Sequence, residues 1–234
     1  MNNITLGVVA AIASLAGGAQ AMAQNQQPQH MARPSEMREG NRDFADRFST
    51  ASLFANPESA SRAYEHAAVT ARCMVRTGGN RAASLLGGAG TDDPDYSDMS
   101  RALRGRYSGC VRDVAGLVPV ILNGALAEQL LLRENPTLDD RAANVDVTKA
   151  EAYHGNLNGA GVTLSNFSRC LAVYSPGLAF KVLKSDPGTS GEEDAVDALY
   201  GATPECGLTA RPADIAPTAQ RGPIAEGLYY WLHP

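Results

Sequence analysis

Apolar side chains recur at spacings of three and four residues along the segment that begins near Asn56. This spacing is typical of a helix that buries one face. The start of the helix is also marked, because Asn56 can cap its first turn and Pro57 suits its first position. The expected buried positions are Ala60, Tyr64, Ala67, Ala71, Met74 and Val75.

The same pattern predicts further helices along the rest of the chain, separated by glycine- and proline-containing turns. Between 204 and 219 three prolines favour an extended stretch, and 134–162 reads as a polar linker without clear periodicity. The chain is therefore predicted to be all-α. The expected helices are 81–86, 96–112, 118–133, 163–174, 177–184, one that begins at Ser190 with Glu193 in a capping box, and 221–232.

The chain repeats one order of residues around two pairs of cysteines. Arg72-Cys73 returns as Arg169-Cys170, a shift of 97 residues (170 − 73). Gly124-x-x-Ala-Glu128 returns as Gly222-x-x-Ala-Glu226, a shift of 98 (226 − 128). We expect two tandem helical units related by internal duplication, packed with pseudo-twofold symmetry through their closing helices.

Four cysteines permit three pairings, and the repeat favours one of them. If each unit carries its own bridge, the pairs are Cys73–Cys110 and Cys170–Cys206, with nearly equal spacings of 37 (110 − 73) and 36 (206 − 170). A redox or metal role is disfavoured, because neither unit has a CxxC motif or a histidine at zinc-ligand spacing from a cysteine.

The first residues have the pattern of an export signal. Ile4 to Ala19 is mostly apolar and uncharged, and small-x-small sites follow it, so we expect cleavage after Ala23 and a periplasmic or secreted protein. No later segment is apolar enough to span a membrane. The expected organisation is a signal peptide at 1–23, a polar arm at 24–55, unit one at 56–133, a linker at 134–162 and unit two at 163–234.

Charge argues against a nucleic-acid partner. Twenty Lys and Arg against 25 Asp and Glu give a formal net charge of −5, and the arginines are scattered along the sequence. Sequence-independent binding to nucleic acid needs clustered cations.

Arg72 and Arg169 precede the first cysteine of their units, and Glu128 and Glu226 hold matching positions in the closing helices. We expect an Arg72–Glu128 pair and an Arg169–Glu226 pair within the units, both structural, because an arginine fork fits a carboxylate. The alternative is that the glutamates serve a binding or catalytic site.

No motif identifies a reaction, a cofactor or a metal. The acidic loop Asp92-Asp93-Pro94-Asp95 lacks the central glycine and the closing glutamate of a calcium loop, so we interpret it as a solvated turn. HExxH, GxSxG and phosphate-loop motifs are missing from the sequence. No catalytic, cofactor-binding or metal-binding residue is therefore predicted.

The order Cys, short helix, second Cys and closing Arg-Gly-x-x-Ala-Glu-x-Leu-Tyr helix, best seen from Cys170 to Tyr229, resembles a group of uncharacterised exported bacterial proteins. Unit one departs from this pattern, since Asn123 stands where the arginine before Gly124 is expected. The resemblance implies architecture and compartment and carries no activity.

The function expected from the sequence is that of an envelope module without catalytic activity, which binds a partner protein or a small apolar ligand between the units. The alternative is an envelope hydrolase or accessory enzyme with no recognisable motif. An enzyme would show a concave pocket with convergent titratable groups, and a binding module would show a groove or an exposed patch.

Overall fold

A computed structural model describes residues 56–87, 97–111, 117–157 and 162–234. All of them belong to one unit that comprises residues 41–234. The predicted signal peptide (1–23), the polar arm (24–55) and the Asp92–Asp95 loop lie outside the described residues.

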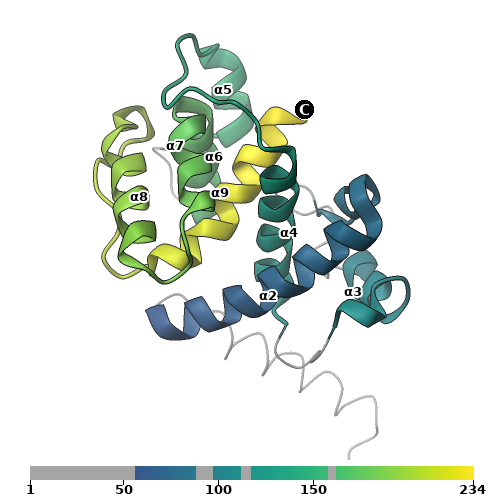
Figure 1. Cartoon of the computed structure of the whole chain (residues 1–234). Helices are drawn as coiled ribbons and strands as arrows, with labels where there is room; N and C mark the ends of the chain where they lie inside the picture. The colour runs from purple at the N-terminus through teal and green to yellow at the C-terminus, as the bar shows by residue number, and fades with distance from the viewer. Residues whose placement is uncertain (1–55, 88–96, 112–116, 158–161) are drawn as a thin grey trace, which may run out of the picture. The chain divides into compact units, whose positions relative to one another are not determined.

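The predicted all-α class is confirmed, since the described residues contain eight α-helices and no strand (Figure 1). The helices are α2 (Pro57–Gly78), α3 (Ser97–Arg104), α4 (Pro119–Glu134), α5 (Val147–His154), α6 (Leu164–Tyr174), α7 (Pro176–Lys184), α8 (Ser190–Gly201) and α9 (Pro217–Leu232). Three 3₁₀ segments accompany them, η1 (Gly79–Leu85), η2 (Ser108–Cys110) and η3 (Pro204–Cys206). None of the described helices has the length and apolar character needed to cross a bilayer.

Local side-chain signals explain where several helices begin. The Asn56 side chain accepts a hydrogen bond from Ser59 N, which caps α2 as predicted. At α8 the cap is Thr189, whose hydroxyl accepts from Glu192 N, and not Ser190 as the sequence suggested. The cap therefore lies one residue before the predicted one.

Several elements differ from the sequence prediction, among them the helix expected at 81–86, which is the 3₁₀ segment η1, and the expected extended stretch 204–219, which contains η3. The single helix expected over 96–112 is the short helix α3 followed by η2. Helix α9 begins at Pro217, before the predicted start at 221, because a proline is favourable at the first helical position. The polar linker contains α5, capped by Asp146, which accepts from Lys149 N.

Helices α4 and α9 lie at the centre of this arrangement (Figure 1). Helix α4 packs against α2 on one side and α9 on the other, and α9 packs in turn against α6. Most of α4 is buried, as its nearly continuous apolar run predicts.

Both predicted disulfides are present. Cys73 of α2 is bonded to Cys110 of η2, and Cys170 of α6 is bonded to Cys206 of η3. Each bridge therefore ties a long helix to a short 3₁₀ segment that has few backbone hydrogen bonds of its own.

The two central helices approach each other at a pair of glycines. A Cβ atom added to Gly124 would lie 2.3 Å from the Cα of Gly222, a distance that real atoms do not tolerate. Gly124 and Gly222 also hold equivalent positions in the sequence repeat. A side chain at position 124 would push α4 and α9 apart.

Candidate functional site

The predicted ion pair between Arg72 and Glu128 is wrong, because the two side chains are connected only by hydrogen bonds through a third residue. Glu128 forms its ion pair with Arg221 of α9, with Arg221 Nε 2.6 Å from Glu128 Oε2. Arg72 donates from Nε to Gln129 Oε1 at 3.3 Å, and Gln129 Nε2 donates to Glu128 Oε1 at 3.4 Å. The predicted partners are thus joined through Gln129.

Arg221 is the centre of a buried polar cluster that joins five helices. Its side chain lies between the carboxylates of Glu128 on α4 and Glu192 on α8, and all three residues are at most 3% exposed. Tyr64 of α2 donates to Glu128, and Thr218 of α9 donates to Glu192. These five residues are called the Arg221 cluster below.

The remaining donors of Arg221 bind backbone oxygens at the end of α7. Nη1 donates to Val182 O at 2.9 Å, and Nη2 donates to Leu183 O at 2.6 Å. A carbonyl near a helix C-terminus is a favourable partner for a cation. A buried arginine is tolerated here because every part of its fork has an acceptor.

The surroundings of the cluster shift the pKa values of two of its members, Arg221 and Tyr64. Burial on its own would lower the pKa of Arg221, but the hydrogen bond and the negative charge of Glu128 outweigh it and raise that pKa. Burial, followed by the charge of Glu128, raises the pKa of Tyr64 well above its usual range. Arg221 therefore stays charged and Tyr64 neutral, so this closed cluster is structural.

The predicted Arg169–Glu226 pair is replaced as well. The guanidinium of Arg169 is near enough to lower the pKa of Glu226, but no ion pair joins the two among the described residues. Arg169 instead donates from Nη1 to Tyr153 O at 3.3 Å, and its Nε is buried without a hydrogen-bond partner in the described part of the chain. Residue 226 faces Asn123 of α4.

Glu226 has an unusual environment for a carboxyl group. Burial raises its pKa from an ordinary 4.5 to about 7, against smaller lowering effects from Asn123 and Arg169. The Asn123 amide is completely buried, and its Nδ2 makes no hydrogen bond of good geometry within the described residues. The carboxyl group thus faces weak partners.

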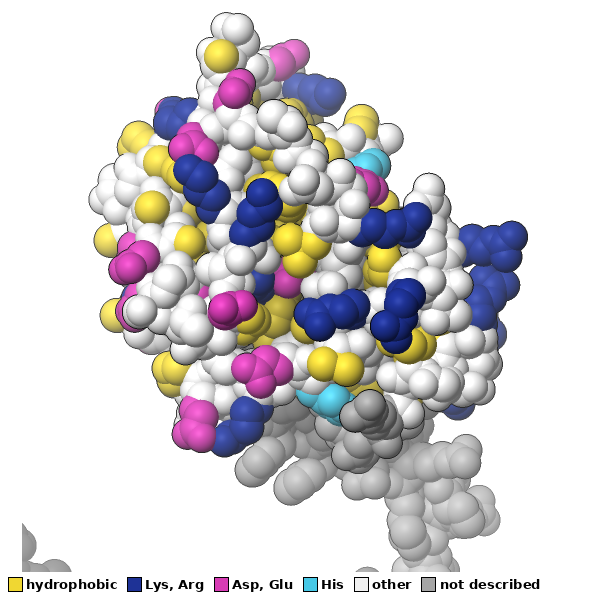
Figure 2. All heavy atoms as spheres, viewed as in Figure 1, with side chains coloured by type: hydrophobic (Ala, Val, Ile, Leu, Met, Phe, Trp, Pro, Cys, Tyr) yellow, Lys and Arg dark blue, Asp and Glu magenta, His cyan; other side chains and the backbone are white. Residues whose placement is uncertain are grey.

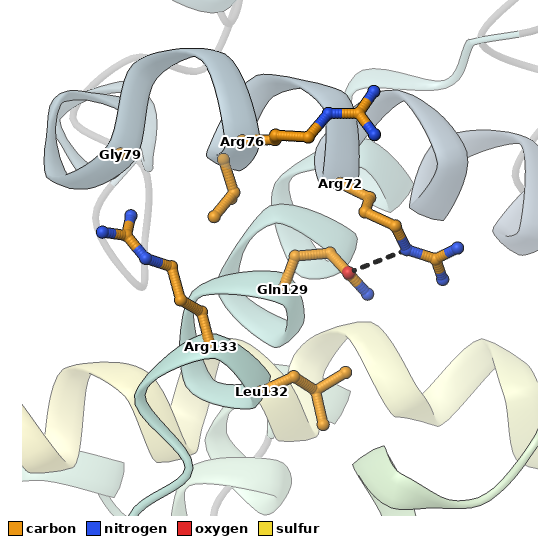
Figure 3. A pocket seen from close by; sticks show the side chains of 7 residues that line it. Arg72, Arg76, Gly79, Gln129, Leu132 and Arg133 are labelled. Atoms are coloured by element: carbon orange, nitrogen blue, oxygen red, sulfur yellow. Dashed lines mark hydrogen bonds between the residues drawn. The ribbon is translucent and has the colours of Figure 1, made fainter.

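A hollow of about 540 Å³ opens between α2 and α4, on the side of α4 that carries Gln129. Figure 3 shows arginines of both helices around the hollow, with the guanidinium groups of Arg72 and Arg76 directed to one side and that of Arg133 to the other. Apolar side chains of both helices, Val75 and Leu132, also line it. The lining consists of Arg72, Val75, Arg76, Gly79, Gln129, Leu132 and Arg133, and is called the arginine hollow below.

The three arginines of the hollow differ from many others in this chain. Arg72, Arg76 and Arg133 are exposed and form no ion pair with a described acidic side chain. Some other exposed arginines are paired, as in Arg62 with Glu58 and Arg101 with Asp98, whereas Arg81, Arg104 and Arg106 also form no ion pair with a described acidic side chain. Figure 2 shows Lys and Arg side chains gathered over the end of α2 and neighbouring α4, whereas acidic side chains are scattered over the rest of this face, including the start of α2.

The arginine hollow continues toward the first disulfide. A second hollow of about 290 Å³ shares Arg72 and Arg76 with it and is also lined by Val69, Cys73 and Cys110. The Cys73–Cys110 bridge therefore fixes the part of α2 from which these two arginines project.

Sequence reasoning missed the arginine hollow because its arginines are far apart along the chain. Arg72 and Arg76 are four residues apart, which places them on one face of a helix, and this spacing can be seen in the sequence. Arg133 joins them only through the packing of α2 on α4. Arg221 belongs to the closing motif of unit two, and its partner Glu128 belongs to unit one. The repeat suggests pairing within each unit, so this partner could not be inferred from it.

The site contains no recognisable metal centre, since the described residues include no group of three or more histidine, cysteine or acidic side chains able to hold a metal ion. Comparisons with protein families, with curated proteins and with solved structures find no match. The resemblance to exported bacterial proteins therefore remains a prediction.

Proposed function

We propose that this chain is an exported helical binding protein that recognises an anionic group in the arginine hollow. The observation that carries this proposal is that Arg72, Arg76 and Arg133 line one hollow without an acidic partner among the described residues. Unpaired cations gathered in one place repel each other, and an anion from outside the chain would relieve that repulsion.

The chemistry of the lining narrows the class of ligand. Guanidinium groups bind carboxylate and phosphate oxygens in pairs, which a point charge such as an ammonium does not do. Gln129 holds Arg72 by its Nε, so that the two terminal nitrogens of Arg72 extend away from Gln129 (Figure 3). Val75 and Leu132 add apolar surface. The ligand is thus a phosphate or carboxylate group attached to an apolar body.

The residues that line the arginine hollow favour ligand binding over a hydrolytic reaction at this site. The hollow presents arginines, a glutamine, a glycine and two apolar side chains, and its lining has no nucleophile, general acid or general base. The alternative of an envelope hydrolase would need titratable groups converging on a pocket. Glu226, the carboxyl group with a strongly raised pKa, is not part of this lining.

The expected compartment and the expected duplication belong to the same proposal. Two disulfides are typical of proteins that leave the cytosol, which supports export through residues 1–23. Internal duplication with pseudo-twofold packing is supported by the contact between Gly124 and Gly222, which hold equivalent repeat positions and meet at the crossing of α4 and α9. That close contact leaves no room for an apolar ligand at the crossing, so the ligand is placed in the arginine hollow.

Isothermal titration calorimetry with hexyl phosphate, inorganic phosphate and phosphatidylglycerol vesicles tests this function. We expect hexyl phosphate to bind more tightly than inorganic phosphate, because it adds apolar contact with Val75 and Leu132. Saturable binding of hexyl phosphate would indicate a solution ligand. Binding confined to the vesicles would indicate a lipid headgroup of the same chemistry.

The matched variants are Arg76→Gln with Arg133→Gln, and Arg62→Gln as the control. Arg62 is exposed on the same helix α2 but is paired with Glu58 and does not line the hollow. The double variant should weaken binding at least tenfold, since hydrogen bonds to charged groups contribute about 1.5–3 kcal/mol each. Equal affinity of the wild type and the double variant would overturn the proposal.

A further inference from the structure

The two disulfides differ in how far a molecule from solution can reach them. Cys170 and Cys206 of the second bridge are 0% and 2% exposed, so this bridge is enclosed in the core. In the first bridge Cys73 is partly exposed and Cys110 is 8% exposed. Both residues of the first bridge line a hollow of about 290 Å³. A small molecule that enters this hollow therefore meets the first bridge.

The hollow beside the first bridge is cationic. Arg72 immediately precedes Cys73 on α2, Arg76 follows it by three residues, and both arginines line the hollow. Both are exposed, and neither forms an ion pair with a described acidic side chain. Cations beside a cysteine favour its thiolate form, and they attract anionic molecules from solution.

A hydroxyl group contacts one of the two sulfurs. Thr77 of α2 has its Oγ1 3.9 Å from Cys110 Sγ, and Thr77 is the donor because a disulfide sulfur carries no hydrogen. A donor in this place would stabilise the negative charge that the Cys110 sulfur receives when the bridge opens. This contact indicates Cys110 as the leaving sulfur. The more exposed Cys73 is then the sulfur that an incoming group attacks.

We propose that the Cys73–Cys110 bridge is a site of thiol–disulfide exchange with small thiols that carry a negative charge. The incoming thiolate forms a bond with Cys73 Sγ, and the Cys73–Cys110 bond breaks with its electron pair passing to Cys110 Sγ. A second thiolate attacks the small-thiol sulfur of this mixed disulfide, and Cys73 leaves. Two small thiols are thus oxidised to one disulfide, the bridge is reduced, and two protons pass to the cysteines.

This assignment separates the roles of the two bridges. The lack of a CxxC motif disfavours a built-in redox pair, but exchange with an external thiol needs only an accessible sulfur and a stabilised leaving thiolate. Opening the first bridge would release η2 from α2, whereas the enclosed second bridge would still tie α6 to η3. The inference goes beyond anion binding, since it concerns a covalent change in the bridge itself.

Reduction of the folded, oxidised full chain by three small thiols of different charge tests the site. The probes are 2-mercaptoethanesulfonate, 2-mercaptoethanol and cysteamine, with rates compared per thiolate. Alkylation of the free cysteines at successive times, followed by peptide mapping, follows each bridge separately. We expect the first bridge to open roughly tenfold faster than the second or more, and to react fastest with 2-mercaptoethanesulfonate.

The same mapping identifies the sulfur that is attacked. The mixed disulfide trapped early in the reaction should lie on Cys73 and not on Cys110. Equal opening rates for the two bridges would overturn the proposal. A rate with cysteamine equal to or above that with 2-mercaptoethanesulfonate would overturn the preference for an anionic thiol.

Variants of the flanking arginines test the origin of this preference. Arg72→Gln with Arg76→Gln should remove most of the advantage of the anionic thiol over cysteamine, whereas the control Arg62→Gln should retain it, because Arg62 does not line the hollow. An unchanged advantage in the double variant would contradict the role of these arginines. None of these outcomes depends on the calorimetric titration with hexyl phosphate, so the two proposals fail separately.

Discussion

Arg221 and Glu128 lie 93 residues apart in the sequence, yet Arg221 Nε is 2.6 Å from Glu128 Oε2. The Arg221 side chain also binds Glu192 and the last turn of α7. One side chain of α9 thus connects α4, α7 and α8. The pair belongs to the interface between the two closing helices and not to the interior of one predicted unit.

Truncation of one member of this pair should be strongly destabilising. Glu128→Ala leaves the Arg221 charge buried with fewer partners, so we expect a loss of about 3–5 kcal/mol in the free energy of unfolding. Replacing both residues by apolar ones, as in Glu128→Leu with Arg221→Met, should cost clearly less than the sum of the single changes. Urea denaturation of the four proteins measures this coupling, and additive losses would show that the pair does not act as a unit.

The glycine contact at the crossing predicts a steric effect. Gly124→Ala would place a Cβ atom within 2.3 Å of the Gly222 backbone, which flexible side chains cannot relieve. We expect a loss of about 1–3 kcal/mol from overpacking. Gly109→Ala is the control, because no atom lies within 4 Å of its added Cβ. Thermal unfolding that ranks the two variants equally would contradict a close α4–α9 crossing.

Removal of one disulfide should lower stability without changing the other bridge. The Cys170→Ser, Cys206→Ser variant opens a loop of 36 residues, for which the chain-entropy account gives a loss of about 4 kcal/mol. Non-reducing peptide mapping should still find Cys73 linked to Cys110. A wild-type crosslink between Cys73 and Cys170 would show that the bridges do not follow the repeat.

A second carboxyl group beside Glu226 should make the protein more sensitive to pH. Asn123→Asp keeps the shape of the side chain and its acceptor for Gly87 N, but places two carboxyl groups together. A carboxyl group whose pKa is raised in the folded state stabilises the fold less as the pH rises through that pKa. Like charges raise the pKa of one member further, so the loss of stability on raising the pH should be larger and should extend above 7. Denaturant unfolding at pH 5 and pH 8 measures this, and a pH response equal to that of the wild type would speak against the contact.

Much of the fold followed from local signals in the sequence. Asn56 capped its helix as predicted, and the repeat selected the correct disulfides. These features depend on neighbours in the sequence or on a matched spacing. Helix α5 was not predicted because it has few apolar positions. Thr189 was not predicted as the N-cap of α8 because the next residue, Ser190, is an equally suitable capping residue.

The polar contacts could not be inferred in the same way. Arg72 and Glu128 were correctly selected as residues of one neighbourhood, but Gln129 intervenes between them and Arg221 takes the carboxylate. Which cation reaches a buried carboxylate depends on how α4 crosses α9, and that angle is set by tertiary packing. The arginine hollow could not be predicted either, because only the packing of α2 on α4 places Arg133 and Arg76 at the same hollow.

The most direct test of the proposed function is a nitrogen-15 NMR titration of the arginine Nε–Hε resonances with hexyl phosphate. Anion binding in the arginine hollow predicts saturable shifts for Arg72, Arg76 and Arg133, with one common dissociation constant, and unchanged resonances for Arg62 and Arg211, which are paired with acidic side chains elsewhere. Shifts of similar size at all five arginines, or no saturable shift at the three that line the hollow, would contradict the proposal.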